Sequence, residues 1–170
     1  MTMASEAKAQ TELKDFPNIF SLEGKVVVVT GGSRGLGLHA ASGFVIVSSC
    51  QICLRFGFLA DHATSFLQAG CSKVYITSRK KAACDSACEA LNALPNKRPG
   101  AQAISVPADS AKIGDIEGLV KEVSKTTDHV DILFANAGAT WGEKFDTHPD
   151  DAFAKVMDLN VKSVFNTIRL

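Results

Sequence analysis

An apolar run of β-branched residues followed at once by a glycine-rich turn restricts the fold of this sequence more than any other feature. Residues 25–30 read KVVVVT and residues 30–37 read TGGSRGLG. Such a run is typical of a strand buried on both faces of a parallel sheet. Glycines between a strand and a helix let backbone N–H groups approach a phosphate. The spacing Gly31-x3-Gly35-x-Gly37 differs from G-x-G-x-x-G, and a plain tight turn is the competing interpretation.

Three more short apolar segments repeat the theme of the first strand. They alternate with segments of helical spacing at 79–94 and 113–125, and a last helix is expected to begin near Asp150 or Asp151. This alternation predicts an α/β fold, a Rossmann-type doubly wound parallel sheet with about four strands. The three further strands are expected within 73–78, 101–106 and 130–136.

Composition excludes several classes of function. The 170 residues are 46% hydrophobic and 21% charged, and 18 basic side chains balance 18 acidic ones. A neutral chain has no long-range attraction to nucleic acid or to anionic lipid, so neither is an expected partner. Residues 1–20 contain no apolar core of a secretory signal and are interpreted as a flexible lead-in. Five cysteines without such a signal indicate reduced thiols and a cytoplasmic location.

Three motifs in fixed order identify a family resemblance. LEGKVVVVTGGSRGLG at 22–37, ANAG at 135–138 and MDLNVKSVF at 157–165 together resemble the short-chain dehydrogenase/reductase family. Ala135 stands where the family more often has asparagine. The segment from AGATWG to VFNTIR further resembles the 3-oxoacyl reductase and gluconate-dehydrogenase-like groups. The resemblance implies an NAD(P)-binding Rossmann domain over 21–170 and hydride transfer between nicotinamide and a carbonyl or secondary alcohol.

The resemblance also implies a set of cofactor-binding residues. Arg79 ends the second strand, where the adenosine ribose of a dinucleotide sits. With Arg34 it offers two guanidinium groups suited to a phosphate, which favours NADP(H) over NAD(H). The alternatives are that Arg79 and Lys80 form a solvated helix start, and that Asp109 caps a helix. No metal site is expected. The candidate cofactor-binding residues are Gly31, Ser33, Arg34, Gly35, Leu36, Gly37, Arg79, Asp109, Asn136, Ala137 and Gly138.

Asn160 resembles the asparagine of the family's Asn-Ser-Tyr-Lys catalytic set, in which it supports a water-linked proton path. The only tyrosine here is Tyr75, and no Tyr-x-x-x-Lys follows Asn160. We therefore expect an incomplete domain that carries only the N-terminal part of the fold and is inactive alone, while the intact member would form a homo-oligomer. The alternatives are a non-catalytic nucleotide-binding or interaction protein and, third, a membrane-tethered regulator.

The segment 45–66 does not fit the expected first crossover helix. Gly37 and Lys73 are too far apart for one typical helix and a short turn. If 45–66 is omitted, Leu38, Ala41 and Leu67 share a helical face and Gly70 becomes a C-cap. We interpret 45–66 as an insertion in the first crossover helix, such as translated unspliced sequence.

Three other interpretations of the insertion were weighed. Its polar residues, Arg55 among them, argue against a membrane span. A zinc site would have to combine Cys50-x2-Cys53 with Cys84-x3-Cys88, and the second pair lies in a helical segment. A redox Cys-x-x-Cys requires a helix N-terminus and a thioredoxin-like frame, neither of which is evident.

Overall fold

The computed structural model describes residues 22–45, 70–95 and 97–170. Four parallel strands form one sheet in the order β3-β2-β1-β4, which confirms the predicted Rossmann-type fold. In register, Val28 of β1 lies opposite Tyr75 of β2 and Leu133 of β4. The strands are β1 (Val26–Thr30), β2 (Lys73–Thr77), β3 (Gln102–Ser105) and β4 (Ile132–Ala135).

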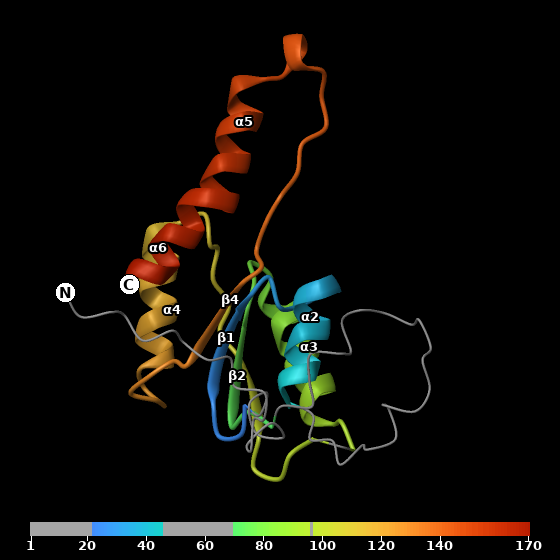
Figure 1. Cartoon of the computed structure of the whole chain (residues 1–170), viewed down its shortest axis with the longest axis vertical. Helices are drawn as coiled ribbons and strands as arrows, with labels where there is room; N and C mark the ends of the chain where they lie inside the picture. Colours follow the sequence, from blue (N-terminus) through green and yellow to red (C-terminus); the bar gives the residue numbers. More distant parts are fainter. Residues whose placement is uncertain (1–21, 46–69, 96) are drawn as a thin grey trace, which may run out of the picture.

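The two faces of the sheet are covered by different helices (Figure 1). Helices α2 (Gly35–Val45) and α3 (Lys81–Asn92) pack on the face that carries Val27 and Val29. Helix α4 (Ile113–Val123) packs on the opposite face, against Val26, Val28 and Tyr75. Neighbouring strand residues point to opposite faces, so an uninterrupted apolar strand supplies both cores.

The chain after β4 runs away from the sheet and returns as one long helical segment (Figure 1). A 3-10 turn, η2 (Phe145–Thr147), precedes α5 (Asp150–Met157). The π-helical turn η3 (Asp158–Lys162) then joins α5 to α6 (Ser163–Arg169), which contacts α4 and β4. The predicted helix start near Asp150 is confirmed, although the N-cap is Pro149 and the two aspartates lie in the first turn.

The apolar segment 130–136 was expected to form a strand with the pattern of the other three and to lie unprotected at an edge of the sheet. Strand β4 lies at such an edge. Phe134 is 37% exposed and Ala135 is also exposed, in agreement with an edge position. The predicted lead-in and nearly all of the predicted insertion 45–66 lie outside the described residues. Gly70 has a positive φ of 67°, as a C-cap requires, but the residues before it are also outside the described part.

Candidate functional site: a pocket at the carboxyl ends of the strands

The loops that follow β1, β2, β3 and β4 meet at one edge of the sheet and surround a pocket of about 320 Å³. In doubly wound sheets, ligands bind at this edge, outside the carboxyl ends of the strands. The pocket brings together the predicted cofactor-binding residues except Leu36 and Gly37, and the predicted catalytic residue Asn160 does not line it either. The lining residues are Gly31, Ser33, Arg34, Gly35, Ser78, Arg79, Ala108, Asp109, Ser110, Asn136, Ala137, Gly138 and Leu159.

Three positions of the glycine-rich turn, Gly31, Gly35 and Gly37, favour glycine for different structural reasons. Gly31 and Gly35 have φ values of 66° and 54°, which favour glycine. A Cβ on Gly35 would meet no atom within 4 Å, so the pocket wall is open at that point. A Cβ on Gly37 would instead lie 2.4 Å from the carbonyl oxygen of Gly31. Gly35 therefore leaves space for a ligand, whereas Gly37 is needed so that α2 can pack against the turn.

Asn136 ties the end of β4 to the glycine-rich turn. Its Nδ2 donates to the carbonyl oxygens of Thr30 at 3.2 Å and Gly31 at 3.4 Å. The neighbouring Ala137 N–H donates to Thr30 Oγ1 at 3.0 Å. These bonds supply partners to backbone groups where β1 and β4 end. They also hold the small residues Ala137 and Gly138 at the pocket wall.

The charged groups of the pocket come from three loops. The side chains of Arg34 and Arg79 belong to exposed residues. Among the residues that the structure describes, no hydrogen bond or ion pair engages either guanidinium group. Asp109 Oδ1 accepts the N–H of Ala111 at 3.2 Å, and Lys112 Nζ lies 4.0 Å from Asp109 Oδ2. The bond to Ala111 closes a turn before α4, whose N-cap is Lys112 with no side-chain cap bond. The helix-cap alternative for Asp109 is therefore wrong, and Asp109 lines the pocket.

Asn160 lies beside the pocket in the π-helical turn η3. Its Nδ2 donates to the carbonyl oxygen of Ala139 at 2.8 Å, and its Oδ1 accepts the Ala139 N–H at 2.8 Å. A Cβ on Gly138 would lie 3.2 Å from Asn160 Oδ1, so this contact also requires a small residue at 138. Both polar atoms of the Asn160 side chain therefore bind the backbone of Ala139 and hold the loop after β4 in place.

Four lining residues were missed by the sequence reasoning: Ser78, Ala108, Ser110 and Leu159. Ser78 directly follows β2, and its Oγ lies 3.1 Å from Cys84 Sγ. Ala108 and Ser110 flank Asp109 and are buried. Ser78, Ala108 and Ser110 could have been found from their position, since each lies within a few residues of the end of a strand. Leu159 could have been found only through its neighbour Asn160.

Other kinds of site find no support in the parts of the chain that are described. Across 22–45, 70–95 and 97–170, no group of three His, Cys, Asp or Glu side chains could hold a metal. Cys84 and Cys88 of the zinc alternative are buried in α3, and Cys50 and Cys53 lie outside these ranges. None of the described helices has the length and apolar character needed to cross a bilayer.

Four parallel strands with helices on both faces and a glycine-lined pocket at their carboxyl edge define a Rossmann-type nucleotide-binding fold. The sequence matches the short chain dehydrogenase family over residues 56–170, and the chain belongs to that family. This match begins inside the predicted insertion, so it does not cover the glycine-rich turn.

Individual relatives cover the turn as well. A rhamnolipid-biosynthesis 3-oxoacyl-[acyl-carrier-protein] reductase of Pseudomonas aeruginosa is 33% identical over 150 residues, which are 88% of this chain and 47% of that protein. A 2-dehydro-3-deoxy-D-gluconate 5-dehydrogenase of Escherichia coli is 34% identical over 146 residues, 86% of this chain and 46% of its own. The predicted likeness to these two groups is confirmed. The chain spans about half the length of these relatives.

Solved structures agree with the fold. The Pseudomonas aeruginosa RhlG/NADP active-site complex superposes with a TM-score of 0.67 at 31% identity, over 88% of this chain and 47% of that one. The L-sorbose reductase of Gluconobacter frateurii, solved with NADPH and L-sorbose, gives a TM-score of 0.68 at 22% identity, over 88% and 47%. The second likeness supports the fold alone.

Proposed function

We propose that the pocket binds a nicotinamide adenine dinucleotide, and NADP(H) in preference to NAD(H). One observation carries this proposal: Arg34 and Arg79 both line a pocket that has the glycine turn on its wall. Neither guanidinium has a hydrogen-bond or ion-pair partner within the described residues, so both are available to a 2′-phosphate. A planar guanidinium binds phosphate oxygens through paired, charge-assisted hydrogen bonds. The relative RhlG, solved as an NADP complex, supports the same choice.

The reaction is inferred from the family. A bound nicotinamide would supply or accept a hydride, and the full-length protein would exchange it with a carbonyl or secondary alcohol. The chain's own residues would hold and orient the cofactor: Asp109 on the adenine side, and Asn136 to Gly138 along the ribose. Asn160 takes its place in the proton path from the family resemblance, and its hold on Ala139 fixes the loop next to the cofactor.

We expect the 170-residue chain alone to catalyse no reduction. Carbonyl reduction needs a proton donor within reach of the substrate. Tyr75, the only tyrosine, is fully buried in the core that faces α4. Its hydroxyl lies 2.6 Å from Thr126 Oγ1, and it does not line the pocket. Tight NADPH binding without turnover would also favour the alternative function, a non-catalytic nucleotide-binding or interaction protein.

The test is calorimetric titration of the 170-residue chain with NADPH and with NADH. Charge-assisted hydrogen bonds contribute about 1.5–3 kcal/mol each, so Arg79→Ala should weaken NADPH binding by roughly 10- to 150-fold. NADH binding should change little. Arg169→Ala, an exposed arginine at the end of α6, is the matched control. Equal affinity for both cofactors, unaffected by Arg79→Ala and Arg34→Ala, would exclude the proposed preference.

We also propose that the full-length protein is a homo-oligomer, as the resemblance implies. Its support on this chain is a row of apolar side chains along α5, η3 and α6, namely Phe153, Met157, Val161, Phe165 and Ile168, which are 41–70% exposed. Apolar faces of this kind usually mark an interaction surface. Sedimentation velocity of the full-length protein at increasing concentration tests this, and a monomer throughout would contradict it.

A further inference from the structure

Strand β3 lies at an edge of the sheet, so one side of its backbone faces away from β2. Gln102 directs its N–H toward β2, where it donates to the Ser72 carbonyl oxygen at 3.0 Å. Successive residues of a strand direct their backbone groups to opposite sides. Ala101 and Ala103 therefore direct their N–H and C=O groups away from the sheet. Such groups are a ready template for pairing with another chain.

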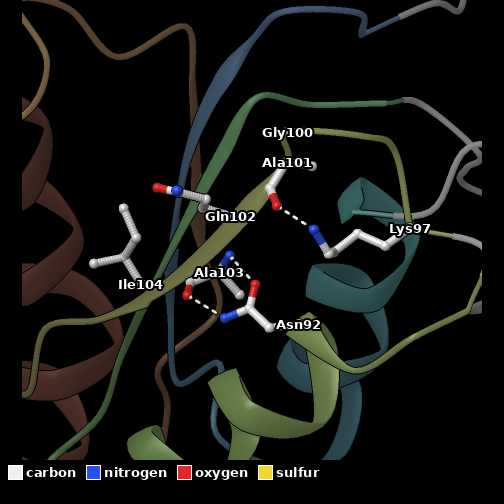
Figure 2. A pocket seen from close by; sticks show the side chains of 7 residues that line it. All are labelled: Asn92, Lys97, Gly100, Ala101, Gln102, Ala103 and Ile104. Atoms are coloured by element: carbon white, nitrogen blue, oxygen red, sulfur yellow. Dashed lines mark hydrogen bonds between the residues drawn. The ribbon is translucent and has the colours of Figure 1, made fainter.

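All four of these backbone groups have partners within the chain, and Figure 2 shows the bonds made by Asn92 and Lys97. Asn92 Nδ2 donates to the Ala103 carbonyl oxygen at 2.8 Å, and Asn92 Oδ1 accepts the Ala103 N–H at 2.9 Å. Lys97 Nζ donates to the Ala101 carbonyl oxygen at 2.5 Å. The Ala101 N–H donates to the Arg98 carbonyl oxygen at 3.0 Å. The outward side of β3 between these two residues is thus saturated.

Asn92 is chemically suited to this place. A primary amide carries a donor and an acceptor side by side, like the peptide group of a neighbouring strand. Asn92 ends α3, and one further α3 residue reaches β3 from the same helix, since Ser105 Oγ donates to Asp85 Oδ1 at 2.6 Å. The helix that covers one sheet face therefore also contacts its edge, at the backbone of Ala103 and the side chain of Ser105.

Among the residues that the structure describes, steric bulk does not protect this edge. A hollow of about 350 Å³ lies beside it, lined by Asn92, Lys97 and residues 100–104. An extended backbone would have room there if the hydrogen-bonding positions were vacant. The edge is therefore closed to another strand only because the outward N–H and C=O groups of Ala101 and Ala103 already have hydrogen-bond partners.

We propose that Asn92, assisted by Lys97, closes the outer edge of β3 and prevents β3 of a second copy of this chain from adding to the sheet. The simplest association of this kind is a two-fold dimer, because β3 of each copy then pairs with β3 of the other and no second kind of edge is needed. The inference is independent of the proposed cofactor binding, since the edge and the cofactor pocket share no lining residue.

The test compares three changes in the full chain. Asn92→Ala removes both hydrogen bonds, Asn92→Asp keeps the acceptor and loses the donor, and Ser86→Ala is a control on an exposed position of the same helix. We expect Asn92→Ala to accelerate amide hydrogen exchange at Ala103 by roughly tenfold, the factor that corresponds to one lost hydrogen bond of ordinary strength. Ser86→Ala should leave exchange at Ala103 unchanged, and Asn92→Asp should show an intermediate rate.

Self-association is then measured by sedimentation velocity. At equal concentration, Asn92→Ala should sediment as a larger species than the parent, because dimers form. Adding Gln102→Lys to Asn92→Ala should restore the parent's sedimentation, because a charged edge strand resists pairing. The reversal distinguishes strand addition from general unfolding, which a lysine at 102 would not repair. Unchanged exchange at Ala103, unchanged association of Asn92→Ala, or failure of Gln102→Lys to reverse it would each overturn the proposal.

Discussion

Substitution of Gly37 by alanine should destabilise the fold, although alanine is the better helix former. The added Cβ would lie 2.4 Å from the Gly31 carbonyl oxygen and 2.6 Å from Asn136 Nδ2. Favourable contacts of this kind lie near 3.5 Å, so the turn and α2 must separate by about 1 Å. Two such contacts at once place the cost of overpacking at the upper end of the usual range, about 2–3 kcal/mol. Helix propensity returns at most about 1 kcal/mol, so we expect a net loss of about 1–2 kcal/mol.

Gly118→Ala in α4 is the matched control. It lies within the helix, and an added Cβ there would meet no atom within 4 Å. It should therefore stabilise the fold by about 0.5–1 kcal/mol. Urea unfolding followed by circular dichroism measures both effects; with an m-value of about 2 kcal/mol/M, Gly37→Ala lowers the midpoint by about 0.5–1 M. A midpoint for Gly37→Ala equal to or above that of the parent would refute the packing argument.

Three further predictions concern single side chains. Tyr75→Phe should lower the free energy of unfolding by about 0.5–1.5 kcal/mol in urea titrations, because it removes the part-buried hydrogen bond between the Tyr75 and Thr126 hydroxyls. The hydrogen bond from Lys25 Nζ lowers the pKa of Asp131. The contribution of Asp131 to stability is therefore present at neutral pH and is lost as the pH falls through the folded-state pKa. The urea midpoints of Asp131→Asn and of the parent should accordingly converge in acid. Burial raises the pKa of Cys71 to about 11, so little of this thiol is ionised at pH 8. Iodoacetamide should therefore leave Cys71 unlabelled in the folded chain and label it completely in urea. Peptide mass spectrometry measures the extent of labelling.

The strands could be predicted because their information is local. A run such as Val26–Val29 supplies apolar side chains to both faces of a parallel sheet, and no helix of comparable length would bury all of them. The pocket could be predicted for the same reason. Each of its loops directly follows a strand, and the carboxyl ends of parallel strands share one edge.

The remaining features depend on contacts between distant residues. Nothing near Asn92 or Asn160 in the sequence indicates that both side-chain atoms of each amide bind one backbone position, Ala103 in the first case and Ala139 in the second. Asn160 was predicted as a site residue only from a motif, and its partner lies 21 positions away.

The predicted site residues therefore divide into two groups with different experimental value. Gly37, Asn136 and Asn160 make contacts within the protein that the fold needs with or without a cofactor. Their substitution would reduce binding under either interpretation of the glycine-rich turn, as a cofactor site or as a plain tight turn. Arg34 and Arg79 are exposed, and within the described residues they support no other side chain. Among these five residues, a selective loss of NADPH affinity without a change in the urea midpoint is therefore expected only for the two arginines, and it is the result that separates the two interpretations.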